Sequence, residues 1–149
     1  PMNATRTFTV PGPEGAERAG RDLQNPAPPT RENIVRGEVL FGRFCEVCHG
    51  PKGEGDGPII GRFPNPPSLL ADRARDLPDG RIYHVITHGQ GIMRPYSYQV
   101  GETDRWRVVR YVRRLQGVPM PEIAPAATST QAATSVGGTN AVVEKGVAP

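Results

Sequence analysis

The stretch Cys45-Glu46-Val47-Cys48-His49 decides how this sequence is interpreted, because it holds the only two cysteines among 149 residues. A Cys-x-x-Cys-His run is the pattern of covalent c-type haem attachment. Each thiol can form a thioether with one vinyl group of a porphyrin, and the adjacent imidazole is then held next to the iron as its proximal ligand. The pentapeptide therefore predicts one covalent haem c, attached through Cys45 and Cys48, with His49 on the iron.

The Cys-x-x-Cys spacing also occurs in disulfides, zinc sites and thioredoxin-like redox sites. A four-ligand zinc site needs a second pair of ligands, and His84 and His88 are the residues that could supply it. A thioredoxin-type site sits between a strand and a helix, whereas the residues around Cys45 have helical periodicity and no hydrophobic strand precedes them. The haem interpretation is the one that uses every residue of the motif.

Composition limits the size of the folded part. The chain has 18 glycines and 17 prolines, too many turn-forming residues for one continuous core. We expect an extended Pro-rich arm over residues 1–29, a folded domain over 30–117 and a low-complexity tail over 118–149. So short a domain cannot bury enough apolar surface of its own for a stable core, and a large buried macrocycle would supply the missing surface.

The domain shows helical patterns and no convincing strand, which predicts an all-α fold. The first helix begins after Thr30, a plausible N-cap, and its stripe of Gly37, Phe41, Phe44 and Cys48 leads into the attachment motif. A second helix follows residues 78–80 and ends at Gly89. A third runs over about 102–116, with acidic residues first and basic residues last, as a helix dipole favours.

The third helix carries a buried stripe and many arginines. Val108, Tyr111, Val112 and Leu115 form the stripe, and Trp106 widens it. Arginine occupies much of the remaining surface, which predicts a strongly positive exposed face. The arginines concerned are Arg105, Arg107, Arg110, Arg113 and Arg114.

These residues, in this order, resemble a class I cytochrome c. In that family a first helix with a glycine and an aromatic crosses a last helix with an aromatic, around one haem. The resemblance places Gly37, Phe41 and Tyr111 at this crossing, with Phe41 and Tyr111 near the haem, and it makes Met93 the second axial ligand.

The resemblance also gives roles to residues near the two ligands. It implies that the carbonyl of Pro58 accepts the ring Nδ1–H of His49. His84 and His88 could compete with Met93 for the iron, but in the family the methionine loop approaches it. We therefore expect both histidines at the surface or behind the ligands.

Over about residues 25–116 the chain resembles more closely the monohaem cytochrome subunit of alternative complex III. The shared phrases are Asn25-Pro26, Arg36-Gly37-Glu38, Cys-His-Gly, the run from Gly53 to Pro58, Ile86-Thr87-His88-Gly89 and the run from Arg105 to Val112. The resemblance implies a subunit that is not catalytic alone. It would take electrons from a multihaem cytochrome subunit of a quinol-oxidising membrane complex and pass them to a periplasmic carrier or oxidase.

Other functions remain as alternatives. The chain could be a freely diffusing periplasmic cytochrome or an oxidase-associated one, and a haem enzyme or gas sensor would need a labile distal ligand with His88 as its polar residue. No apolar stretch approaches the length of ~20 residues that is needed to cross a bilayer. A net charge of +3 and 6% aromatic residues do not indicate nucleic-acid binding.

The start of the chain and the attachment motif bear on location. The sequence begins Pro1-Met2 without a signal-peptide pattern, so we expect a processed or truncated precursor. Haem attachment to this motif implies maturation outside the cytoplasmic membrane. We therefore expect a peripheral location on the periplasmic side.

Overall fold

The computed structural model describes residues 10–59 and 61–119, and in this part of the chain every regular element is a helix. The elements are α1 (Pro13–Asp22), α2 (Arg31–Phe44), α3 (Glu46–His49), α4 (Asp72–Arg75), α5 (Asp79–His88) and α6 (Glu102–Leu115). The predicted all-α fold is confirmed. Residues 1–9 of the predicted arm, and the predicted tail from 120 onward, lie outside the described residues.

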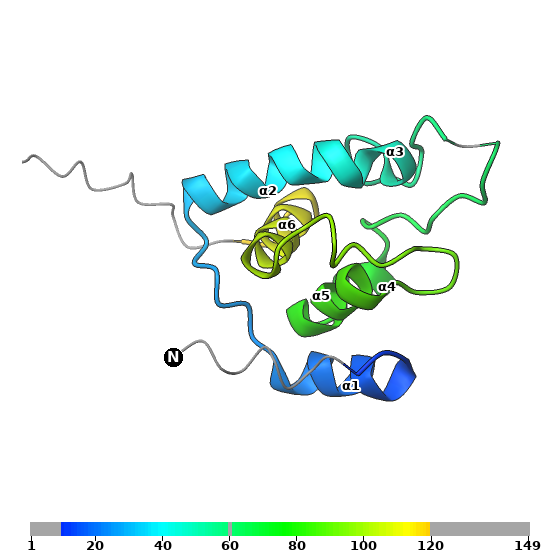
Figure 1. Cartoon of the computed structure of the whole chain (residues 1–149). Helices are drawn as coiled ribbons and strands as arrows, with labels where there is room; N and C mark the ends of the chain where they lie inside the picture. Colours follow the sequence, from blue (N-terminus) through cyan, green and yellow to red (C-terminus); the bar gives the residue numbers. More distant parts are fainter. Residues whose placement is uncertain (1–9, 60, 120–149) are drawn as a thin grey trace, which may run out of the picture.

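The crossing of α2 and α6 is the centre of the fold (Figure 1). Thr30 caps α2 by accepting a hydrogen bond from the backbone N–H of Asn33. At Gly37 the helices touch so closely that an added Cβ would stand 2.1 Å from the Arg107 carbonyl oxygen. The Phe41 ring is buried there, 5.3 Å from that of Tyr111. The class I crossing predicted from Gly37, Phe41 and Tyr111 is therefore present.

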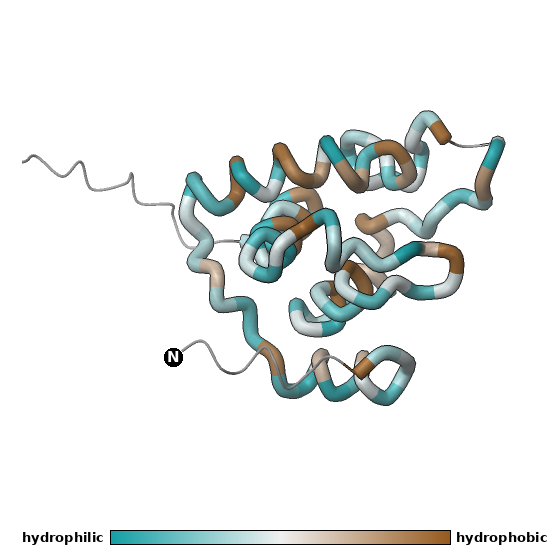
Figure 2. The backbone as a smooth tube through the Cα atoms, in the orientation of Figure 1, coloured by the Kyte–Doolittle hydropathy of each residue, from teal (hydrophilic) through white to brown (hydrophobic). Residues whose placement is uncertain are grey.

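The four longer helices follow one another in space as α2, α6, α5 and α1 (Figure 1). Trp106 of α6 and Tyr83 of α5 stack with ring centroids 4.0 Å apart, which joins the middle pair. Figure 2 shows hydrophobic stretches along α2, α5 and α6, while α1 is mostly hydrophilic. In the described part of the chain, no helix has the length and apolar character that a bilayer span requires.

Helix α1 corrects the prediction of an extended arm over residues 1–29. It begins with Pro13 in its first turn and packs against α5 through small residues. A Cβ on Gly80 of α5 would stand 2.0 Å from the Ala19 carbonyl oxygen, so the two backbones are in direct contact. Because α1 needs only glycine and alanine on its buried side, it lacks the large apolar stripe by which a packed helix is usually found.

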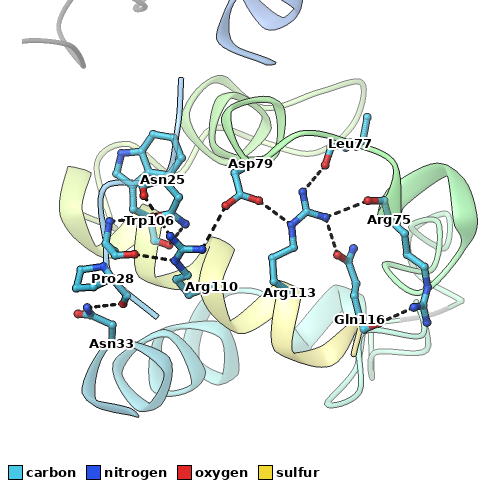
Figure 3. A network of polar contacts seen from close by, with 11 residues as sticks. Asn25, Pro28, Asn33, Arg75, Leu77, Asp79, Trp106, Arg110, Arg113 and Gln116 are labelled. Carbon is cyan, nitrogen blue, oxygen red and sulfur yellow. Dashed lines mark hydrogen bonds and ion pairs between the residues drawn. The ribbon is translucent and has the colours of Figure 1, made fainter. Parts of the chain in front are cut away.

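The arginines of α6 also differ from expectation, since most of them bond to the protein instead of forming a positive face. Arg105 is buried and donates to the Val100 carbonyl and the Tyr83 hydroxyl. Arg110 donates to the carbonyls of Asn25 and Ala27, and so ties the segment before α2 to α6 (Figure 3). Arg107 donates to the side chain of Asn33, and Arg113 donates to the carboxylate of Asp79. Arg114 is exposed. Carbonyls at the ends of irregular segments need donors, and arginine supplies several at once.

Candidate functional site

The attachment motif is a tight turn at the end of α2. Cys45 ends α2, and α3 places Cys48 and His49 within one further turn. The backbone N–H of His49 donates to the Cys45 carbonyl over 2.9 Å. Thiols three positions apart and the following imidazole are thus presented by one rigid turn.

The loop from residue 50 to 59 fixes this turn by hydrogen bonding to its backbone. The N–H of Gly55 donates to the His49 carbonyl over 2.8 Å, and that of Gly57 donates to the Cys48 carbonyl over 3.2 Å. A Cβ on Gly57 would stand 2.4 Å from the Val47 carbonyl oxygen. The glycine-rich sequence of this loop is therefore explained by its close contact with the motif.

A cavity opens beside the motif and encloses about 580 Å³ of space, which includes solvent at its mouth. Four of the predicted site residues line it, namely Phe41, Cys45, His49 and Met93. The rest of the lining comes from the 69–77 segment, α5 and α6, and it is apolar apart from Gln116. The structure therefore brings a thiol, an imidazole and a thioether into one apolar cavity.

Met93 reaches the cavity from a loop that folds back onto the end of α5. Gln90 and Met93 exchange two backbone hydrogen bonds of 3.0 Å each. Gly89 ends α5 with a φ of 77°, and a Cβ there would stand 2.3 Å from the Met93 carbonyl oxygen. This is a position where glycine is required, both for the left-handed conformation and for the close approach.

Burial controls the protonation of the site. It lowers the pKa of His49, which favours the neutral imidazole, the form that ligates iron. Burial, and secondarily the charge of Cys48, raises the pKa of the Cys45 thiol to about 12. Both groups are therefore uncharged at neutral pH in the folded chain.

The remaining predicted site residues lie outside the cavity lining. Cys48 is half-buried one turn beyond Cys45, and Tyr111 packs on the far side of Phe41. The Nδ1 atom of His49 is buried and has no hydrogen-bond partner among the described residues. The predicted bond from this atom to the carbonyl of Pro58 is thus not made in this structure.

The two other histidines lie away from the cavity. His84 is buried, not at the surface, and its Nε2 lies 3.1 Å from the Val10 carbonyl oxygen beneath the segment leading into α1. The His88 ring is 4.6 Å from that of His84. Within the described residues no cluster of three or more His, Cys, Asp or Glu side chains could hold a metal ion, so the zinc alternative has no geometric support.

Sequence reasoning missed several residues at the cavity. Leu69, Leu77 and Gln116 line it, although none of them was a candidate. Gln116 continues the series Val108, Val112 at intervals of four, and this spacing could have indicated its position. Tyr96 was also missed. Burial raises the pKa of its phenol, and the charges of Cys45 and Cys48 raise it further, which shows that Tyr96 lies near both cysteines.

These observations fit a covalently held haem c. The cavity is apolar, as a porphyrin face requires, and the donor set of paired thiols, neutral imidazole and thioether suits iron in a macrocycle. The fit depends on residues from both ends of the domain, from Phe41 of α2 to Gln116 beyond α6.

Comparison with solved structures finds two chains that align with this one, and the first of them shows the same fold. A chain of the reducing HAO-like protein complex of Kuenenia stuttgartiensis aligns with a TM-score of 0.52 and 24% identity, over 62% of this chain and 49% of its own. Cytochrome cL from Hyphomicrobium denitrificans aligns with a TM-score of 0.47 and 18% identity, over 68% of this chain and 58% of its own. The chain thus spans about half the length of the first of these structures. No curated protein sequence matches it.

The family comparison is more specific. Residues 32–112, more than half of the chain, match the family described as cytochrome c oxidase, cbb3-type, subunit III. This range contains the attachment motif, Met93 and most of both helices of the crossing. The chain therefore belongs to this family of c-type cytochrome domains, with haem c as its cofactor and haem-based electron transfer as its function.

Proposed function

We propose that Cys45 and Cys48 hold one haem c by thioether bonds and that His49 and Met93 are its axial ligands. The observation that carries this proposal is that His49 and Met93, far apart in sequence, line the same apolar cavity. When bound, the haem supplies a one-electron ferrous/ferric couple.

The protein's own residues support this role in distinct ways. The 50–59 loop holds the His49 backbone in place, and burial keeps the imidazole neutral and able to donate its lone pair. The bridge between Gln90 and Met93 holds the thioether loop against α5. A rigid ligand set reduces rearrangement between the two oxidation states, which suits electron transfer better than catalysis at the iron.

The position of Met93 also favours electron transfer over a haem enzyme or gas sensor. Such a protein needs an open or labile distal position and a polar residue beside it. His88, the polar candidate, does not line the cavity, whereas Met93 does.

We further propose that the chain is a peripheral, periplasmic subunit of a quinol-oxidising membrane complex of the alternative complex III type. In this role it takes electrons from a multihaem cytochrome subunit and passes them to a periplasmic carrier or oxidase. The sequence resemblance over residues 25–116 supports this assignment. It includes Asn25, whose side chain donates to the Trp106 carbonyl and so belongs to the folded domain.

A second candidate follows from the family match. The matched description names a subunit of a cbb3-type oxidase, which favours an oxidase-associated cytochrome that delivers electrons to an oxygen-reducing partner. A freely diffusing periplasmic cytochrome is the third member of this set. All three share the haem site and differ in the partner.

Optical spectra of the purified chain test the ligands. We expect a Soret band, a sharp α-band after dithionite reduction, and in the oxidised form the weak charge-transfer band of sulfur bound to ferric haem. Met93→Ala should abolish the sulfur band and lower the reduction potential, whereas His88→Gln should change neither. A sulfur band that survives in Met93→Ala would refute the ligand assignment.

Purification of the tagged full-length chain from its native membranes tests the partner. Recovery in a stable complex with a multihaem cytochrome and quinol-oxidising activity is expected. Recovery with an oxygen-reducing oxidase would replace this assignment by the second candidate. Recovery as a single chain from the periplasmic extract would replace it by the third.

A further inference from the structure

One wall of the cavity is formed by the segment of residues 69–77, which has little regular structure. Leu69, Ala74 and Leu77 line the cavity, and the only helix in the segment is the four-residue α4. Its helical neighbours cannot hold it by extensive packing, since α4 forms none of the major helix-to-helix contacts. The backbone N–H of Leu69 donates to the Gly53 carbonyl over 2.8 Å, and side chains from elsewhere add to this hold on the wall.

Gln116, just after α6, supplies that connection. Gln116 is 2% exposed and is the one polar residue in the lining besides Cys45 and His49. The Nε2 atom donates to the Leu69 carbonyl over 2.8 Å and to the Ala74 carbonyl over 3.4 Å. The amide thus joins two of the three lining residues of the wall to the end of α6.

Arg113 holds Gln116 in this orientation, as Figure 3 shows. One guanidinium nitrogen donates to the Gln116 Oε1 over 2.8 Å, and Nε donates to Asp79 Oδ1 over 2.7 Å. The same guanidinium also donates to the carbonyls of Arg75 and Leu77. The side chain of Arg113 is only 11% exposed, so its ion pair with Asp79 is held behind the wall.

We propose that Gln116, positioned by Arg113, is a latch that holds the 69–77 wall against α6 and thereby raises the reduction potential of the haem. The proposal rests on the proposed function, because it requires the haem in this cavity. The latch consists of the side chains of Gln116 and Arg113.

The physical argument concerns charge and water. Ferric haem carries one more positive charge than ferrous haem, so water that reaches the cavity stabilises the ferric form and lowers the potential. A wall held by hydrogen bonds to its carbonyls excludes that water, and without Gln116 the Leu69 carbonyl would need a water molecule as its donor. Loss of Arg113 acts in the same direction, because Asp79 would keep only its 3.8 Å ion pair with Arg110, and a less compensated carboxylate favours the ferric state.

Redox titration of holoprotein variants tests the latch. Gln116→Met removes the amide but keeps an unbranched side chain that can fill the wall, and Gln116→Ala removes both. We expect the ferrous-to-ferric ratio at a fixed ambient potential to fall about tenfold in each, a shift of about 59 mV for one electron. Gln24→Met, a change at an exposed glutamine, is the matched control and should leave the ratio unchanged.

A second pair of variants separates the position of Arg113 from its charge. Arg113→Gln and Arg114→Gln remove the same charge from neighbouring positions, but Arg114 is exposed. The ferrous-to-ferric ratio at a fixed ambient potential should fall several-fold further in Arg113→Gln than in Arg114→Gln. Amide hydrogen exchange over residues 69–77 should quicken in Gln116→Met and in Arg113→Gln, and remain as in the native protein in both controls.

The outcomes are distinguishable. Native potentials in Gln116→Met and Arg113→Gln, with the haem spectrum intact, would refute the latch while leaving the proposed function in place. A lowered potential with unchanged exchange over 69–77 would also refute it, because the wall would not have opened. Absence of covalent haem from the native chain would refute the proposed function itself.

Discussion

Gly37 of α2 lies directly against the backbone of Arg107 of α6, so that a Cβ at Gly37 would stand 2.1 Å from the Arg107 carbonyl oxygen. The Tyr111 Cβ is 3.1 Å from the same point. Neither a backbone carbonyl nor a Cβ can move away without shifting its helix. The crossing distance of the two helices is therefore set by the absence of a side chain at Gly37.

Replacing this glycine tests that conclusion. Alanine is the better helix former by about 1 kcal/mol, yet we expect Gly37→Ala to destabilise the holoprotein by about 1–3 kcal/mol because the helices must separate. Gly42→Ala on the exposed side of α2 is the control, since its Cβ would meet only the Glu46 carboxylate at 3.4 Å. Urea unfolding should show the two alanines acting in opposite directions.

Phe41 is expected to be a principal core residue at the same crossing. It is 2% exposed and contacts both Tyr111 and the cavity. Phe41→Ala should cost about 3–5 kcal/mol in free energy of unfolding. Val39→Ala, at a position that is 56% exposed, should cost far less. A loss below about 1 kcal/mol for Phe41→Ala would remove this residue from the core.

A single added methyl group at Gly80 should break the contact between α1 and α5. Gly80→Ala would place a Cβ 2.0 Å from the Ala19 carbonyl oxygen, so we expect α1 to leave α5. Proteolysis within residues 13–22 should then become faster, while the haem spectrum stays native. In Gly20→Ala the new Cβ would meet Arg81 at an ordinary 3.5 Å, and protection should remain. Equal protection in both variants would contradict the close contact.

Asp104 gives the stability a dependence on acid pH. The hydrogen bond from Arg36, above all, lowers the pKa of Asp104, and Arg107 adds to this. In the unfolded chain an aspartate titrates near pH ~4, so the contribution is complete above that pH and is lost as the pH falls through the lower folded value.

Urea unfolding at pH 7 and pH 3 measures this dependence. Solvent screens the half-exposed Arg36, so we expect protonation of Asp104 to cause only a small loss of stability. Asp104→Asn should reduce the difference between the two pH values, and Asp76→Asn, at an exposed aspartate, should not. A difference that persists unchanged in Asp104→Asn would assign the effect to other carboxylates.

The sequence predicted the longer helices of the domain well, because their ends carry local signals. Thr30 caps α2, and α5 ends at Gly89 in the left-handed conformation. Helix α6 spans Glu102–Leu115, close to the predicted 102–116, with acidic and basic ends as expected. The spacing of Gly37 and Phe41 predicted one face of α2. The crossing itself was predicted from the resemblance to class I cytochromes c.

The residues that the sequence did not predict depend on long-range contacts. Nothing local shows that Arg113 is turned toward Asp79 and Gln116 instead of toward solvent. His84 is polar by composition and becomes buried only because α1 and the preceding segment cover it. Tertiary packing, which periodicity does not encode, decided both cases.

The crossing of α2 and α6 has a consequence for the order of assembly. Asn33 and Arg107 are hydrogen-bonded across it although they are 74 positions apart, and contacts between such distant segments form slowly because a long loop must close first. The thiols belong to the α2 end, whereas α6 and Gln116 complete the cavity from the other end. During synthesis the cysteines are therefore made before the helix that completes the cavity beside them. An enzyme that attaches the porphyrin can act on an open, flexible substrate, and the finished holoprotein then encloses its own modification.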